Sequence, residues 1–301
     1  MPPLVSEWGA IDRQLPPPLT AVEAPHDGMA RSIVLGMPQL CLGGLSETWL
    51  LKDIGHRHWT LLGYALGQSL PEFEDASGAP VHAAFNAVAL RQGDLRAVRA
   101  GAVLHVASDL TRLSNTQFRT LHRLSSQGRM VAEVEVISVF VKRMVPGVNR
   151  SAATAAPLGL PRLARRTAPA GFVADASALR ADRWETHFGF RRSEARPRAE
   201  LVIDPCPSQD FNGVGFLYCA MFQSFVDRAE WAFFRLSGRQ PSTRRREIIY
   251  RGNIEVGDRI IVTLMDVLRQ DRALTHWCRL TRQGGGETLA DVFTDRTLAD
   301  S

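Results

Sequence analysis

One short motif occurs twice in this chain. The stretch 123–128 reads RLSSQG, and the stretch 279–284, which starts 156 residues later, reads RLTRQG. The same offset aligns three further pairs: Gly101 with Gly257, Val106 with Val262, and Val136 with Val292. A spacing of this size matches a whole domain. The sequence therefore predicts one structural unit present twice, with a site at the seam between the copies.

Each copy is expected to contain a long helix and several antiparallel strands. The helices are predicted at 47–62, with Ser46 as N-cap, and at 213–234. Runs rich in β-branched residues predict strands at 81–90, 102–107, 130–142, 248–250, 259–264, 274–281 and 288–293. The second helix is apolar on nearly every face as far as Asp227, so it must be buried on all sides. A sheet that curls around the helix meets this requirement.

The two helices also resemble each other, at an offset of 172 residues that pairs Gly43 with Gly215 and Trp59 with Trp231. We expect four segments. They are an N-terminal arm (1–29), a first domain (30–145), a linker or surface excursion (146–197) and a second domain (198–298).

The chain is basic, with a net charge of +5 that rests almost wholly on arginine. This favours anionic partners such as a nucleotide phosphate, an acidic carrier protein or nucleic acid; a solvated, arginine-rich surface is the alternative. Aromatic residues do not alternate with the basic runs, as a nucleic-acid stacking platform requires. We also see no membrane-spanning run, signal peptide or metal-ligand spacing of cysteines. We therefore expect a cytoplasmic protein without nucleic-acid, membrane or metal binding.

The segment 210–218, DFNGVGFLY, is similar to the D-x-N-G-H-x-N-x-x-Y pattern of hydroxybenzoyl-CoA thioesterases, which have the hot-dog fold. The matching residues are Asp210, Asn212 and Gly213. Val214 and Phe216 replace the histidine and the second asparagine, and Tyr218 comes one residue early. These departures argue against a simple thioesterase.

Two longer stretches resemble a narrower family. Residues 36–59 (GMPQLCLGGLSETWLLKDIGHRHW) and 203–231 are similar to the LnmK-like double hot-dog acyltransferase/decarboxylase family of polyketide and nonribosomal peptide biosynthesis, whose type member belongs to the leinamycin pathway. The resemblance covers roughly residues 30–298 and is weakest at 146–200. It implies an α+β double hot-dog fold, in which two fused domains each wrap an antiparallel sheet around a long helix.

The resemblance also implies an activity. Such an enzyme moves a (methyl)malonyl-derived acyl group from coenzyme A to an acyl carrier protein and decarboxylates it. The coenzyme A thioester and the carrier phosphopantetheine are then substrates, and no cofactor is permanently bound. We expect a monomer, which is a pseudo-dimer, or a homodimer. The alternatives are a hot-dog thioesterase or dehydratase, and a non-catalytic protein that binds an acyl carrier.

Three residues are candidates for catalysis. Asp210 directly precedes the second predicted helix, where the thioesterase resemblance implies a base or nucleophile; a helix cap is the alternative. Tyr64 is the only tyrosine of the first copy, and the family resemblance implies a tyrosine there. His82 lies on a predicted strand and is a candidate general acid near neutral pH. Packing and ordinary hydrogen bonding are the alternatives for Tyr64 and His82.

Substrate binding is expected at the two helix starts. Unpaired backbone N–H groups there stabilise negative charge on a thioester oxygen, and glycine allows a close approach. The expected residues are Asn212, Gly213, Val214 and Gly215 in the second copy, and Gly43 and Gly44 in the first. Tight packing of the helix start is the alternative for the glycines. Because Pro38 occupies the position that corresponds to Asp210, we expect one working site.

Overall fold

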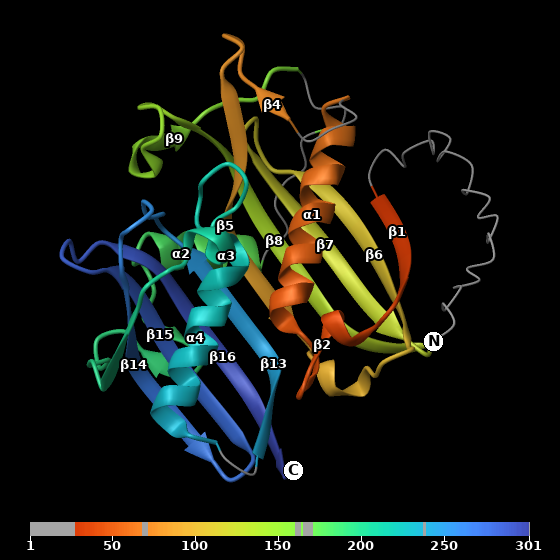
Figure 1. The fold of residues 1–301 in the computed structure, drawn as a ribbon, viewed down its shortest axis with the longest axis vertical. Helices are drawn as coiled ribbons and strands as arrows, with labels where there is room; N and C mark the ends of the chain where they lie inside the picture. The colour runs from red at the N-terminus through yellow and green to blue at the C-terminus, as the bar shows by residue number, and fades with distance from the viewer. Residues whose placement is uncertain (1–27, 68–71, 160–163, 165–170, 237–238, 301) are drawn as a thin grey trace, which may run out of the picture.

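The computed structural model describes residues 28–67, 72–159, 164, 171–236 and 239–300. One long antiparallel sheet curls around two helices (Figure 1), with strands in the order β1-β6-β7-β8-β5-β13-β16-β15-β14-β12. The first copy contributes β1 (Gly28–Val34), β5 (Pro80–Arg91), β6 (Val103–Arg112), β7 (Gln117–Ser126) and β8 (Arg129–Arg143). The second contributes β12 (Ala199–Ile203), β13 (Arg239–Tyr250), β14 (Ile260–Gln270), β15 (Ala273–Arg282) and β16 (Thr288–Asp300).

The strand order is a palindrome centred on β5 and β13. These two strands pair antiparallel, with Val88 opposite Ile248. Outwards from that pair, each strand of one copy has its counterpart in the other. The predicted duplication and the double hot-dog fold are therefore confirmed. The repeated motifs form the β7–β8 and β15–β16 turns, where Gly128 (φ 74°) and Gly284 (φ 83°) adopt the left-handed conformation that glycine favours.

The helix predicted at 47–62 is confirmed as α1 (Glu47–Ala65). Its N-cap is Ser46, whose hydroxyl accepts a hydrogen bond from the backbone of Trp49. The helix predicted at 213–234 begins six residues later than expected, as α4 (Cys219–Phe234). Residues 211–218 instead form a loop, in which Gly215 has a φ of 80° and cannot continue a right-handed helix.

The two helices lie antiparallel, with their N-terminal halves side by side (Figure 1). Thr48 of α1 donates a hydrogen bond of 2.8 Å to Gln223 of α4. The apolar core beneath them is continuous across both copies and includes Leu50, Val88 and Phe225. The seam between the copies is thus closed by helix contacts on one side and by the β5–β13 pair on the other.

Shorter helices and strands complete the structure. They are α2 (Phe172–Arg180), α3 (Pro207–Asp210), η1 (Met37–Gln39), η2 (Leu95–Ala97), η3 (Asn149–Ser151), β2 (Leu40–Cys41), β3 (Gly44–Leu45), β4 (Phe73–Glu74), β9 (Ala152–Thr154), β10 (Thr186–His187) and β11 (Phe190–Arg191). Part of the predicted excursion is an ordered cover: Phe172 and Phe190 share an apolar cluster with Trp277 and Phe293 of the sheet. Among the described residues, no helix is long and apolar enough to cross a membrane.

Candidate functional site at the seam

The loop 211–218 carries the segment that resembles thioesterases. Asn212 holds its conformation, because the side-chain oxygen accepts hydrogen bonds from the backbone N–H groups of Val214 (3.2 Å) and Phe216 (3.0 Å). Gly213 and Val214 are exposed at the tip. The predicted binding residues of the second copy therefore lie together in one loop, with Asn212 as its internal cap.

Two side chains from outside the second copy hold this loop in place, as a clamp. Arg143, at the end of β8, donates to the carbonyl of Val214 (2.5 Å), and its guanidinium lies 4.0 Å from the ring centre of Phe216. Asn149 donates 2.7 Å hydrogen bonds to the carbonyls of Gly215 and Ile254. Arg143 of the first copy and Asn149 of the segment that follows it thus hold the loop of the second copy.

His82 reaches the same loop from β5. Its ring centre lies 5.5 Å from that of Phe216, in an edge-to-face arrangement. Burial, with a smaller contribution from the charge of Arg143, lowers the pKa of His82. The imidazole is therefore mainly neutral at pH 7 and can accept a proton at one nitrogen.

On the helix side, the loop ends in Tyr218, whose hydroxyl points at α1. The hydroxyl oxygen lies 3.5 Å from the carbonyl of Lys52 and 3.3 Å from the position that a Cβ would take on Gly55. The ring of Trp59 meets that of Tyr218 edge to face at 6.0 Å. Burial raises the pKa of Tyr218 above its ordinary value, so the phenol stays protonated.

The helix start itself also faces this region. Tyr218 is the N-cap of α4 but provides no side-chain hydrogen bond to the first turn. The first N–H groups of an α-helix have no partner within the helix, and a helix start favours negative charge nearby. Here the N–H groups of Cys219 and Ala220 contact the sulfur of Cys219. Burial raises the pKa of the Cys219 thiol to about 12, which keeps it protonated and makes it a poor nucleophile.

Asp210 lies near the site, but its carboxylate is already engaged in a hydrogen bond with the backbone. It ends the short helix α3, is 4% exposed, and its carboxylate accepts a 2.7 Å hydrogen bond from the backbone N–H of Cys206. Its own carbonyl accepts the N–H of Tyr218. The loop separates it from α4, so Asp210 stabilises the turn before the loop and does not stand at the start of the long helix as expected.

Tyr64 lies apart from this loop. It is in the last turn of α1, nine residues beyond Gly55, which corresponds to about 13 Å along the helix axis. Its side chain is 37% exposed. Among the described residues, Tyr64 makes no side-chain hydrogen bond or ring contact with His82 or with loop 211–218.

Gly43 and Gly44 also lie elsewhere, in the β2–β3 hairpin. A Cβ on Gly44 would come within 2.1 Å of the carbonyl oxygen of Leu95, and Gly44 has a φ of 102°, so tight packing alone requires glycine there. The hairpin borders an open surface pocket of about 500 Å³ that Arg96, Val98 and Arg99 also line. Its lining residues do not overlap with those around loop 211–218.

Several residues of the seam were missed by reasoning from sequence: Lys52, Gly55, Trp59, Phe85, Arg143 and Asn149. They carry no motif. Tyr218 is absent from the predicted site because the apolar segment around it was assigned to the helix. The one available signal was Gly55, a glycine inside a predicted helix, which often marks a close approach.

Comparison with known proteins adds the fold family. No protein-family model matches the chain, and no curated protein matches it. Among solved structures, the 12:0-ACP thioesterase from Umbellularia californica is similar with a TM-score of 0.59 and 11% identity, covering 90% of this chain and 94% of that one. An acyl-ACP thioesterase from Bacteroides thetaiotaomicron gives 0.59, with 10% identity and 90% and 98% covered. A protein described as an oleoyl thioesterase from Lactobacillus plantarum gives 0.62, with 12% identity and 91% and 97% covered. The chain thus has the double hot-dog fold over nearly its whole length.

Proposed function

We propose that this protein is an enzyme that acts on acyl thioesters at loop 211–218. Its reaction moves a (methyl)malonyl-derived acyl group from coenzyme A to an acyl carrier protein, with decarboxylation. One observation carries the proposal. The cationic groups Lys52 and Arg143 flank the loop, whereas the carboxylate of Asp210 is buried against its own backbone.

This charge distribution suits a substrate that carries a carboxylate. A free aspartate at the loop would repel a malonyl group, because like charges a few ångströms apart raise each other's energy. Asp210 is instead held by the N–H of Cys206. A hydrolase needs a base that activates water, and Asp210 is poorly placed for that role. Transfer to a thiol does not need this water.

The proposed chemistry has two steps. In the first, the bond between the α-carbon and the carboxylate breaks, carbon dioxide leaves, and the electron pair forms the enolate of the thioester. The N–H groups at the start of α4 stabilise the enolate oxygen. The protonated hydroxyl of Tyr218 then donates its proton to the α-carbon and regains one from solvent. Tyr64, which the family resemblance suggested, is the rival source of this hydroxyl.

In the second step, the thiol of the carrier phosphopantetheine attacks the thioester carbonyl. The bond to the coenzyme A sulfur breaks, and the thiolate leaves and takes up a proton. His82 accepts the proton of the attacking thiol in this scheme, and the lowered pKa of its imidazole favours the neutral form that can do so. The carbonyl oxygen becomes negative in this step too, so the same helix start serves both steps.

Hydrolysis is the second candidate. It is favoured by the similar structures, which are described as thioesterases. In that reaction His82 would activate water in place of the carrier thiol.

Mass spectrometry of a reaction with methylmalonyl-CoA and N-acetylcysteamine as acceptor separates these reactions. Transfer with decarboxylation yields propionyl-N-acetylcysteamine, and hydrolysis yields free acid. Release of neither coenzyme A nor carbon dioxide would overturn the enzymatic proposal and leave the carrier-binding alternative.

Single variants then assign the roles. We expect Tyr218→Phe to lower kcat by about 10²–10⁴-fold, the usual range for a general acid. The matched variant Tyr64→Phe is expected to keep near wild-type turnover. The reverse result would place the reaction at Tyr64. His82→Gln should slow transfer, and Asp210→Asn should act mainly on stability.

A further inference from the structure

The two copies can be compared residue by residue. An offset of 172 relates the helices, and an offset of 156 relates β7 and β8 to β15 and β16. The contacts support these offsets. His58 of α1 bonds Thr120 of β7, and their counterparts, Glu230 of α4 and His276 of β15, also bond each other. Every seam position of one copy therefore has a defined counterpart in the other.

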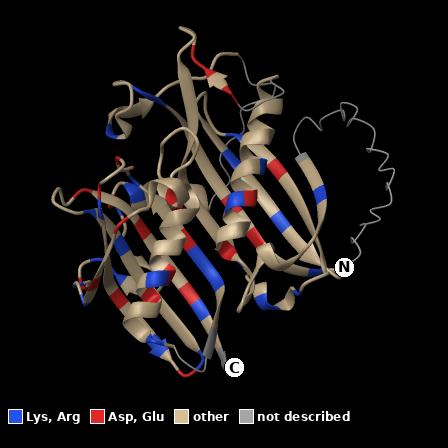
Figure 2. Ribbon diagram, viewed as in Figure 1, with Lys and Arg blue, Asp and Glu red and all other residues tan. Residues whose placement is uncertain are grey.

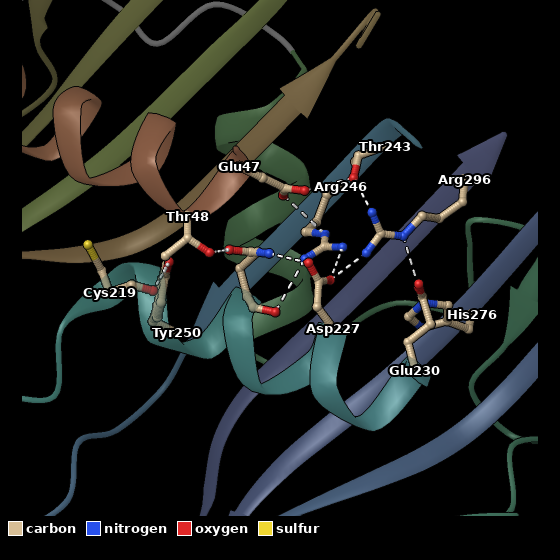
Figure 3. Close-up of polar contacts among 11 residues, drawn as sticks. Glu47, Thr48, Cys219, Asp227, Glu230, Thr243, Arg246, Tyr250, His276 and Arg296 are labelled. Carbon is tan, nitrogen blue, oxygen red and sulfur yellow. Dashed lines mark hydrogen bonds and ion pairs between the residues drawn. The ribbon is translucent and has the colours of Figure 1, made fainter. Parts of the chain in front are cut away.

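At the start of α1, the seam is filled by a charged network (Figure 3). Arg246 of β13 lies 3.2 Å from the carboxylate of Glu47 and 2.7 Å from that of Asp227. Thr243 donates a 2.7 Å hydrogen bond to Glu47. These contacts join α1 of the first copy to α4 and β13 of the second.

Arg296 of β16 extends the network on the other side. Its guanidinium donates to Asp227 (2.5 Å), Glu230 (2.9 Å) and Thr243 (2.8 Å). His276 lies 2.7 Å from the same oxygen of Glu230. Figure 2 shows the resulting mixture of acidic and basic residues along β13 and the strands beside it.

Most of the network is withdrawn from water. Arg246 is 1% exposed, and Glu47, Glu230 and Arg296 are buried, whereas the side chain of Asp227 is 34% exposed. Burial raises the pKa of Glu47, and Arg246 only partly offsets it. Burial acts in the same direction on Glu230, but Arg296 and His276 outweigh it and lower the pKa of Glu230 below its ordinary range.

The corresponding positions of the candidate site carry different residues. The network consists of Glu47, Asp227, Glu230, Thr243, Arg246 and Arg296. Their counterparts, in the same order, are Cys219, Gly55, His58, Ala83, Phe85 and Phe140. The strand counterparts follow from pairing, since Thr243 faces Arg296 as Ala83 faces Phe140. None of the six counterparts is a carboxylate, lysine or arginine.

Gly55 and Asp227 show the contrast most directly. Gly55 has no side chain, and the Tyr218 hydroxyl and the Phe85 ring lie 3.3 Å and 3.8 Å from the position that a Cβ would take there. At the counterpart position, the carboxylate of Asp227 forms ion pairs with the guanidinium groups of Arg246 and Arg296. The six counterpart positions thus contain no carboxylate, lysine or arginine, whereas ion pairs occupy the network.

We infer that one chain binds one acyl thioester, because the network of Glu47, Asp227, Glu230, Arg246 and Arg296 fills the second seam site that the duplication created. This inference rests on the proposed function for the identity of the ligand. It adds the stoichiometry and the residues that set it. The surface pocket beside Gly43 shares no lining residue with the network and is separate from it.

Isothermal titration of the full chain with the amide analogue of propionyl-CoA, in which nitrogen replaces the thioester sulfur, measures the stoichiometry. We expect one equivalent per chain. Two equivalents with wild-type protein would overturn the inference.

A matched pair of variants identifies which end of the seam binds. Gly55→Asp introduces into the candidate site the residue type found at its counterpart, Asp227, but without an arginine partner. We expect this variant to bind the analogue at least about tenfold more weakly. Asp227→Gly makes the opposite exchange within the network and should leave that affinity within about twofold. Gly55→Ala controls for backbone effects. If Gly55→Asp kept the wild-type affinity and Asp227→Gly lost it, the ligand would bind at the charged network and not at the candidate site. That result would overturn the inference.

A readout without ligand separates failure of the inference from failure of the proposed function. If the analogue does not bind at all, the proposed function fails. The closed network still predicts slower amide hydrogen exchange at residues 47–49 than at residues 219–221, because only the former lie beneath buried ion pairs. Equal or faster exchange at residues 47–49 would contradict closure of the second site.

Discussion

Individual residues of the first copy form a buried chain of hydroxyl and imidazole groups beneath α1. His58 lies 2.8 Å from the hydroxyl of Thr120 and 2.7 Å from that of Ser138. His122 contacts Thr120 and Ser108 at 2.8 Å each. All five are at most 2% exposed. Because the groups satisfy one another, the imidazoles remain in the core without charge.

Because His58 and His122 are buried in the neutral form, the stability of the fold should depend on pH. Burial lowers the pKa of His58 to about 3, and burial with nearby positive charge lowers that of His122 well below its usual value. The unfolded chain binds these protons below about pH 6.5, whereas the folded chain does not. The free energy of unfolding should therefore fall as pH drops from about 6.5 towards 3, by up to about 1.4 kcal/mol per pH unit for each histidine. Urea unfolding at several pH values measures this slope.

Two histidines of α1 provide the comparison. His58→Gln should flatten the slope by the share of one histidine, although it also destabilises the protein at pH 8 because Thr120 and Ser138 lose their partner. His56 is exposed, so His56→Gln should keep the wild-type slope. A slope in His58→Gln that equals wild type would contradict neutral burial.

At the scale of elements, the sequence located α1 better than α4. Ser46 is a recognisable N-cap, and the helix begins after it. The segment GVGFLY before Cys219 is apolar and looks like a continuation of the helix. Its loop conformation depends on the side chain of Asn212, and on Arg143 and Asn149, which are more than 60 residues away in the chain. Local pattern contains no information on such contacts.

The loop therefore depends on its distant clamp, which Asn149→Ala tests. The substitution leaves the buried carbonyls of Gly215 and Ile254 without their donor. We expect a loss of about 1–3 kcal/mol in the free energy of unfolding. We also expect kcat/KM to fall by up to about 10²-fold, since a displaced loop misplaces the reacting groups. Denaturant unfolding and steady-state kinetics measure the two effects.

Asn115→Ala is the matched control. Asn115 is exposed and accepts a hydrogen bond from Arg112 at the surface. Its replacement should change stability by no more than about 0.5 kcal/mol. If the two variants behave alike, the clamp does not hold the loop.

For the whole molecule, the duplication was the feature of the sequence that determined most. It predicted one structural unit present twice, and the palindromic strand order confirms this duplication. It did not reveal how the copies divide the seam. The charged residues of the network are scattered from Glu47 to Arg296, and only their shared position in the fold identifies them as one group. The two copies thus share one fold, but the residues at the two ends of the seam differ.

The network should also make the two copies unfold together. Arg296 contacts Asp227, Glu230 and Thr243, and Thr243 in turn contacts Glu47 of the other copy. Arg296→Met retains the volume but leaves the buried Glu230 with the His276 ion pair alone and Asp227 with the Arg246 ion pair alone, among the described residues. Breaking a buried ion pair typically costs about 3–5 kcal/mol. Arg259→Met is the control, because Arg259 and its partner Asp204 are both largely exposed, with side chains 57% and 69% accessible; we expect a loss of at most about 1 kcal/mol. Urea unfolding followed by tryptophan fluorescence should show one transition for wild type and Arg259→Met. A wild-type midpoint for Arg296→Met would contradict the view that this network holds the two copies together.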